Sequence, residues 1–241
     1  MNCLILAAGR GSRLREVSVS KPLTPVGGVP LIARVIRSAA EAGASAFTVV
    51  TGYQAERVEA LLATLGAPVR CVRVEDWTSP NGHSVLAGAA AIDGDYLLAM
   101  SDHLFDPDFA RRLIATGRAG CGVRLAVDRD LDSPLLDLDD ATKVETASGG
   151  KIVRIGKTLE RYDAIDTGLF LAGPELAGAI RADIESGGEG SLSSGVQRLA
   201  DAGQAATLDV TGARWIDVDD PRALSLAEAL FGPDGLRDNA A

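Results

Sequence analysis

The sequence predicts an α/β protein: a three-layer sandwich with a mostly parallel, mixed central sheet. Three observations support this prediction. Apolar runs of strand length alternate with amphipathic helical segments through residue 120. The run 96–100, YLLAM, is apolar throughout, which is typical of a strand buried on both faces of a parallel sheet. The chain has 241 residues, of which 46% are hydrophobic, and this is enough to form a large core.

The first half of the chain reads as strands and helices in turn. The run 2–6 is long enough for a buried strand and too short for a helix. Segment 11–28 shows neither period and contains prolines and glycines, so we expect a loop there. A helix should begin near Pro30, with its apolar face on residues 31, 35, 36 and 39. The next predicted elements are strand 46–51, helix 54–65, edge strand 69–74, helix 84–92 and central strand 96–100.

The pattern changes after residue 120. Strand 121–127 is followed by a hairpin, with strands at 143–146 and 151–155 around Ser-Gly-Gly at 148–150. Strand 165–171 follows, then a helix capped by Ser191 and ending near 199. Pro221 should open the last helix, which ends near 231, and the tail 232–241 is expected to fray. We therefore predict one domain, 1–231, with a small β-hairpin insertion.

Composition excludes several classes of protein. The formal net charge is −9, from 33 acidic and 24 basic residues, so the chain lacks the basic footprint of a nucleic-acid-binding protein. No apolar stretch has the length of a membrane span. Cys3, Cys71 and Cys121 lie in apolar, strand-like runs, and we expect buried free thiols in a reducing compartment. These features predict a cytoplasmic protein.

The long loop after the first strand is the strongest functional signal. It holds Arg10, Arg13, Arg15 and Lys21 around closely spaced glycines, so it is interpreted as an anion cradle. A dinucleotide fingerprint is excluded because Leu14 stands where a third glycine should be. A P-loop is excluded because no Gly-Lys-Ser/Thr triplet follows.

Polar residues follow the other predicted strands. In open α/β sheets ligands bind beyond the carboxyl ends of the strands, so these residues should converge on the glycine loop. The groups are Gly52-Tyr53, the turn 79–84, Ser101-Asp102-His103 and the acidic pair Asp217 and Asp219.

Asp102 is the sharpest candidate for a metal ligand. It ends the central strand, and Mg²⁺ usually takes one or two protein carboxylates and completes its shell with water and phosphate oxygens. Asp102 could instead cap the helix after Pro107, although Asp106 fits that role better. Asp217 and Asp219 alternate along an extended chain, so either could supply a second carboxylate.

The segment Asn81-Gly82-His83-Ser84 is predicted to bind a base and ribose. Asn and Ser offer directional hydrogen bonds, and glycine permits close approach. Pro-Asn-Gly is also a common surface turn, which is the alternative interpretation. His83 and His103 are interpreted as hydrogen-bonding residues and not as bases, because no nucleophile or metal-ligand pairing accompanies them.

The motif L-A-A-G-x-G-x-R-L at 6–14, followed by K-P-L at 21–23, resembles that of the sugar-phosphate nucleotidyltransferase superfamily. This resemblance implies a Rossmann-like nucleotidyltransferase fold, in which 1–120 binds the nucleotide and 121–220 binds an acceptor. It also implies catalytic roles for Arg13 and Lys21. As the second metal ligand it favours Asp219 over Asp217. The implied nucleotide-binding residues are Leu6, Ala7, Ala8, Gly9, Gly11, Ser12, Gly52, Tyr53, Asn81, Gly82, His83 and Ser84.

Segments 81–84, 100–105, 140–144, 155–157 and 164–170 are most similar to CTP:inositol-1-phosphate cytidylyltransferases. The resemblance implies Mg²⁺-dependent transfer of CMP from CTP to inositol 1-phosphate, giving CDP-inositol and pyrophosphate. Lys143 and Lys157 would receive the acceptor phosphate, while Asp166, Thr167 and Gly168 would line the acceptor cavity. For the two lysines an exposed charged face is an equal alternative.

Two departures from the relatives matter. Pro80 stands where relatives often have glycine, and many relatives carry a membrane-embedded phosphotransferase domain on the same chain. We expect a stand-alone enzyme that passes its product to a separate membrane phosphotransferase. The sequence leaves the oligomeric state open, with a homodimer as one alternative.

Two other functions remain as alternatives. One is the same chemistry on phosphocholine, 2-aminoethylphosphonate or a hexose 1-phosphate, with UTP or dTTP as other nucleotides. The other is a non-catalytic nucleotide-binding regulatory subunit. The second is disfavoured because Arg13, Lys21, Asp102 and the pair at 217 and 219 are all present.

Overall fold

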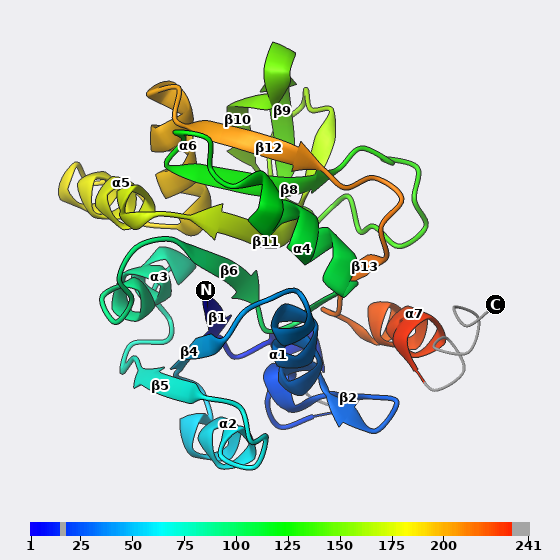
Figure 1. Cartoon of the computed structure of the whole chain (residues 1–241). Coiled ribbons are helices and arrows are strands. Elements are labelled where there is room, and N and C mark those ends of the chain that lie inside the picture. The colour runs from blue at the N-terminus through cyan, green and yellow to red at the C-terminus, as the bar shows by residue number, and fades with distance from the viewer. Residues whose placement is uncertain (15–17, 233–241) are drawn as a thin grey trace.

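The computed structural model describes residues 1–14 and 18–232. Arg15 of the predicted anion cradle, the side chain of Ser12 and the tail from 233 lie outside the described residues. The centre of the described fold is one mixed sheet of nine strands, in the order β5-β4-β1-β6-β11-β8-β12-β10-β9 (Figure 1). The strands are β1 (Asn2–Ala7), β4 (Ala46–Thr51), β5 (Val69–Arg73), β6 (Tyr96–Met100), β8 (Val123–Asp128), β9 (Lys143–Ala147), β10 (Lys151–Gly156), β11 (Ala164–Ala172) and β12 (Ala205–Asp209).

Four neighbouring strands, β5, β4, β1 and β6, run parallel, and β11 joins them antiparallel to β6. Residues of β1 alternate between two hydrophobic cores: Cys3 and Ile5 face one, Leu4 and Leu6 face the other. A strand covered on both faces is mostly apolar, which is why residues 3–7 of β1 and all of β6 are continuous apolar runs.

Helices cover both faces of the sheet, which gives the three predicted layers. One core receives α1 (Leu31–Glu41), α2 (Ala55–Leu62), α4 (Pro107–Thr116) and α7 (Pro221–Phe231). The other core receives α3 (Asn81–Ala89), α5 (Pro174–Glu185) and α6 (Leu192–Asp201). In α1 the predicted apolar face is confirmed, because Leu31, Val35 and Ile36 are all buried.

Two short ribbons complete the described fold. Strands β2 (Pro25–Val26) and β3 (Val29–Pro30) pair within the long loop. Strand β7 (His103–Phe105) pairs antiparallel with β13 (Trp215–Asp217), which places Asp217 opposite His103. The second ribbon therefore brings the end of the chain to the carboxyl end of β6.

The predicted strands and hairpin are confirmed, and β9 and β10 extend the edge of the main sheet. Besides the short strands of the two ribbons, one strand of the main sheet and one covering helix were not predicted. Strand β12 is only five residues long, and its place is fixed by pairing with β8. Helix α5 carried a readable signal, with Pro174 in its first turn and Leu176 and Ile180 buried four residues apart.

Two predictions need correction. Helix α3 begins at Asn81 and not at Ser84, because Pro80 is its N-cap residue and the polar segment forms the first turn. The three thiols are not all buried. Cys71 is exposed on the edge strand β5 and Cys121 is half-buried before β8. Among the described residues, no helix combines the length and apolar character that crossing a bilayer requires.

We expect Gly82→Ala to destabilise the fold by about 1–3 kcal/mol, because inserted atoms force a packed backbone apart. A Cβ at Gly82 would lie 2.2 Å from the Gly190 carbonyl oxygen. Gly178, inside α5, is the matched control: a Cβ there meets no atom within 4 Å, so Gly178→Ala should be neutral or stabilising. Urea unfolding of both variants checks this, and equal midpoints would contradict the packing described here.

Candidate active site

Two adjoining cavities open beyond the carboxyl ends of β1 and β6. The glycine-loop pocket, about 230 Å³, is lined by residues 6–9, Gly11, Lys21, Pro22, Trp77, Ser79, Asn81, Ser84 and residues 100–102. The acidic pocket, about 300 Å³, includes Arg13, His103, Asp137, Asp140, Lys157, Asp166 and Asp217. Four residues line both pockets: Lys21, Asn81, Met100 and Asp102. The two cavities therefore meet at a buried lysine and a carboxylate.

Lys21 lies at this junction in a 3-10 turn, Lys21–Leu23. Its ammonium contacts the carboxylates of Asp102 and Asp219 and lies 3.7 Å from Asp217 Oδ1. Burial alone would lower the pKa of Lys21, but Asp102 and Asp217 outweigh it and the pKa is raised. Lys21 therefore keeps its positive charge.

The glycine loop reaches Lys21 through Gly11. Gly11 has a φ of +57°, and a Cβ there would lie 2.4 Å from the Lys21 Cβ. Both the left-handed backbone and the close approach require glycine at this position.

Asp102, His103 and Asp217 form an oxygen- and nitrogen-rich cluster whose candidate ligand atoms lie within 4.8 Å of one another. Asp217 Oδ1 is buried and has no hydrogen-bond partner among the described residues. A divalent cation would satisfy this oxygen, because carboxylates are the preferred ligands of hard cations. The residues present therefore fit a divalent metal ion.

Hydrogen bonds and charge hold this cluster in place. His103 Nδ1 lies 2.8 Å from the Thr167 carbonyl oxygen, and Nε2 lies 3.3 Å from Asp217 Oδ2. Burial lowers the pKa of His103, but the charges of Asp217 and Asp102 and these hydrogen bonds raise it to about 9. A cation bound through His103 Nε2 would displace the proton on that nitrogen. Binding through the carboxylates of Asp102 and Asp217 needs no such exchange.

Asp219 lies outside this cluster. Its carboxylate contacts the Lys21 ammonium and lies 3.9 Å from Arg13 Nη1. The geometry thus favours Asp217 as the second carboxylate, whereas the sequence resemblance preferred Asp219. The reason is the β7–β13 pairing, which sets Asp217 opposite His103.

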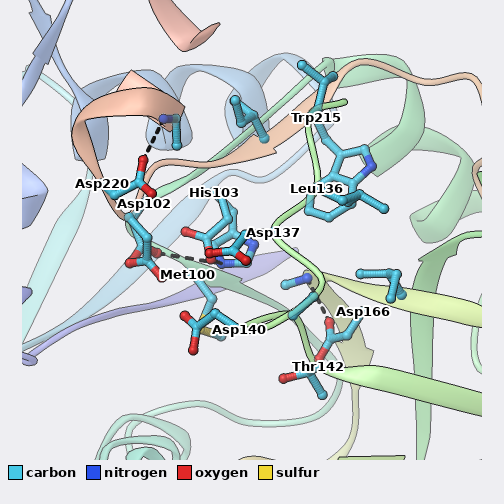
Figure 2. Close-up of a pocket in the computed structure, with 18 of the residues that line it drawn as sticks. Met100, Asp102, His103, Leu136, Asp137, Asp140, Thr142, Asp166, Trp215 and Asp220 are labelled. Atoms are coloured by element: carbon cyan, nitrogen blue, oxygen red, sulfur yellow. Dashed lines mark hydrogen bonds and ion pairs between the residues drawn. The ribbon is translucent and has the colours of Figure 1, made fainter. Parts of the chain in front are cut away.

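The acidic pocket also holds a bridge between two cations. Asp140 lies 3.1 Å from Arg13 through Oδ2 and 2.7 Å from Lys157 through Oδ1. Figure 2 shows Asp102, Asp137, Asp140 and Asp166 directed toward one cavity. Asp166 accepts a hydrogen bond from the Gly168 amide, and burial raises its pKa to about 6.

Trp215 supports the same pocket. Its Nε1 donates to Asp128 at 2.7 Å, and its ring stacks on His103 with centroids 6.3 Å apart. In Figure 2 the Trp215 ring lies beside Leu136, which comes from the loop between β8 and β9. Arg222 anchors this loop by donating a hydrogen bond to the Pro134 carbonyl oxygen.

Several predicted site residues do not line either pocket. Lys143 donates to the Lys157 carbonyl at 3.0 Å and lies over the Tyr162 ring, 5.5 Å from its centroid. The buried Thr167 hydroxyl donates to the Ala126 carbonyl at 2.9 Å, and only its neighbours Asp166 and Gly168 line the cavity.

Gly82 and His83 lie against Gly190 on the far side of α3. Gly82 is needed there for packing, as described above, and a Cβ on Gly190 would lie 3.3 Å from His83 Nε2. Their neighbours Asn81 and Ser84 do reach the glycine-loop pocket. Gly52 and Tyr53 pack against Trp77 and do not line either pocket.

Some lining residues were not predicted. Trp77 lies between an edge strand and a helix, where the sequence shows no period, yet a large aromatic residue there is itself a signal. Asp137, Asp220 and Arg222 come from loops and a helix start whose placement depends on tertiary packing. Asp140 stood in a segment that carried the family resemblance, but its bridge between two cations could not be predicted from spacing.

Fold and site together are typical of an α/β protein that handles phosphate anions: a glycine loop follows β1, a charged lysine lies at the junction of two pockets, and a carboxylate cluster suits a divalent cation. The chain belongs to the MobA-like NTP transferase domain family, whose model matches residues 3–138.

Three proteins are similar to this chain over nearly all of its length. The "Bifunctional IPC transferase and DIPP synthase" of Rubrobacter xylanophilus is 36% identical over 94% of this chain and 51% of its own length. The "CMP-5'-(3-aminopropyl)phosphonate synthase" of Streptomyces rubellomurinus is 29% identical over 97% of this chain and 39% of its own. The solved inositol-1-phosphate CTP transferase from T. maritima has a TM-score of 0.85 at 25% identity, covering 100% of this chain and 97% of that one. The chain spans about half the length of the bifunctional relatives it matches.

We expect Asp102→Asn and Asp217→Asn each to abolish binding of a divalent cation, because each removes a charged oxygen ligand without changing side-chain size. Calorimetric titration of Mg²⁺ or Mn²⁺ measures this without any assay of activity. Asp219→Asn is the matched control and should retain binding. Loss of binding in Asp219→Asn with retention in Asp217→Asn would reverse the assignment.

Proposed function

We propose that this chain is a Mg²⁺-dependent cytidylyltransferase that transfers CMP from CTP to inositol 1-phosphate, giving CDP-inositol and pyrophosphate. The observation that carries this proposal is the junction of the two pockets at Lys21 and Asp102. A group transfer needs donor and acceptor to meet at one point, with charge to stabilise the moving group. The bifunctional relatives and the T. maritima enzyme support the choice of acceptor.

The glycine-loop pocket suits the nucleotide. Backbone N–H groups of the loop at 8–11 can approach phosphates because Gly9 and Gly11 carry no side chain. Ser79, Asn81 and Ser84 line the opposite part of the pocket and offer hydrogen bonds to a base and ribose. The α-phosphate would then lie near Lys21.

The acidic pocket suits a phosphorylated polyol. Arg13 and Lys157 already hold an anion between them, the Asp140 carboxylate. A phosphate monoester carries more charge and more acceptor oxygens, so it can take the place of this carboxylate. Asp137 and Asp166 offer carboxylate oxygens to hydroxyl groups further into the cavity.

The reaction follows from this arrangement. An oxygen of the acceptor phosphate attacks the α-phosphorus of CTP, a new P–O bond forms, and the bond to the β-phosphate breaks to release pyrophosphate. The acceptor oxygen is already anionic at neutral pH, so no general base is needed. Lys21 stabilises the charge on the transferred group, and Arg13 neutralises the approaching acceptor. A bound Mg²⁺, held by Asp102 and Asp217, would supply further charge neutralisation.

The acidity of the second pocket also favours one alternative acceptor. Asp137, Asp140 and Asp166 could bind an ammonium group, and the Streptomyces relative is named for an aminopropylphosphonate. The chemistry at the junction would be unchanged.

Pyrophosphate release from a matrix of nucleotides and acceptors tests the proposal. We expect CTP with inositol 1-phosphate to give the highest kcat/KM. A higher value with an aminoalkylphosphonate or phosphocholine would replace the acceptor but keep the reaction. The absence of pyrophosphate release with every pair would refute the proposed activity.

Lys157 and Lys143 give a matched test of the acceptor site. Lys157→Ala should raise the KM for the acceptor by about ten- to a hundredfold, since a charge-assisted contact to phosphate is lost. Lys143→Ala should change it little, because that ammonium lies against the Lys157 carbonyl and the Tyr162 ring. The KM for CTP should be unchanged in both variants. Equal effects of the two substitutions would contradict the acceptor geometry.

A further inference from the structure

We propose that Trp77 is the aromatic wall against which the nucleotide base stacks, and that Tyr53 and Arg10 support it from behind. The inference rests on the proposed binding of a nucleotide in the glycine-loop pocket. It deepens that function by naming the side chain that supplies affinity for the base. Trp77 is the aromatic residue among those that line this pocket.

The backbone around Trp77 is built to hold it in place. Trp77 lies in the connection between β5 and α3, and the Asp76 carboxylate accepts hydrogen bonds from both neighbours that follow it. Asp76 Oδ1 accepts from the Thr78 amide at 3.0 Å, and Oδ2 accepts from the Ser79 hydroxyl at 2.7 Å. Such an Asx turn fixes the backbone around Trp77 and so the direction of its side chain.

Trp77 packs directly on the glycine-loop side of the sheet. A Cβ at Gly52 would lie 2.8 Å from the Trp77 Cβ and 2.9 Å from the Ala8 carbonyl oxygen. The same carbonyl accepts a hydrogen bond from the Tyr53 amide at 2.9 Å. Gly52 therefore has a structural reason to be glycine: it lets Trp77 approach the end of β1, where the phosphates are proposed to bind.

A row of aromatic contacts supports the indole. The Tyr53 ring meets Trp77 edge-to-face, with centroids 5.1 Å apart and planes at 66°. The Arg10 guanidinium lies over the Tyr53 ring, 5.5 Å from its centroid. Edge-to-face and cation–π contacts of this kind fix ring orientation. Tyr53, predicted from sequence to bind the nucleotide, thus acts through Trp77.

Stacking supplies affinity but little discrimination between bases, because every base has an aromatic face. Discrimination falls to the polar residues opposite. Asn81 Oδ1 accepts from the Leu192 amide at 2.8 Å, which leaves the Asn81 amide N–H₂ group to donate into the pocket. A pyrimidine carbonyl oxygen suits this donor.

Tryptophan fluorescence tests the proposal without an activity assay, because the chain has two tryptophans, Trp77 and Trp215. CTP should change the emission of the wild-type protein and of Trp215→Phe. The change should be absent in Trp77→Phe, a substitution that keeps an aromatic ring and so preserves the fold. A CTP-induced change that persists in Trp77→Phe and is lost in Trp215→Phe would overturn the proposal.

Nucleotide affinity supplies the second measurement. Trp77→Ala should weaken CTP and UTP binding by the same factor, about ten- to a hundredfold, while Trp77→Phe keeps most of the affinity. Unchanged CTP affinity in Trp77→Ala would refute the stacking role and leave the cytidylyltransferase intact. If the wild-type protein binds no nucleoside triphosphate, the proposed function itself fails, so the two failures are distinguishable.

Discussion

The site depends on the ion pairing of one buried ammonium with three carboxylates. Lys21 contacts Asp102 and Asp219 and lies within 4 Å of Asp217. An ammonium taken out of water is stable only if opposite charge surrounds it, and carboxylates gathered at one point repel each other unless a cation lies between them. The Lys21 ammonium and the three carboxylates therefore stabilise one another. Asp217 Oδ1 has no hydrogen-bond partner among the described residues, which leaves an oxygen ligand for a divalent cation in the same cluster.

The sheet supplies the positions of these groups. Asp102 follows β6, and the glycine loop follows the adjacent parallel strand β1, so both open at the same edge. Asp217 arrives on the β7–β13 ribbon, which is paired by register to His103. Strand pairing therefore fixes the positions of Asp102 and Asp217, whereas Lys21 reaches the junction from a 3-10 turn of the long loop. The acceptor side is different, since much of its wall comes from the loop between β8 and β9.

Sequence alone predicted most of the fold, because period and turn residues are local signals. The continuous apolar runs at β1 and β6, the Ser-Gly-Gly hairpin and the Ser191 cap all carry their structure in a few adjacent residues. Gly11, Lys21 and Asp102, which the sequence motifs singled out, all line the glycine-loop pocket. The site was not predictable where long-range packing decides direction: Gly82 and His83 lie toward Gly190, and Lys143 lies behind the pocket that Lys157 enters.

We propose that Lys21 acts on the group being transferred. The single-turnover rate of Lys21→Met at saturating CTP, acceptor and Mg²⁺ tests it most directly, because methionine keeps the side-chain bulk and removes the charge. We expect this rate to fall by about a hundred- to a thousandfold, with the dissociation constant for CTP changed little. A normal rate at saturation, with only a weaker affinity for CTP, would show that Lys21 binds the nucleotide and does not act on the transferred group.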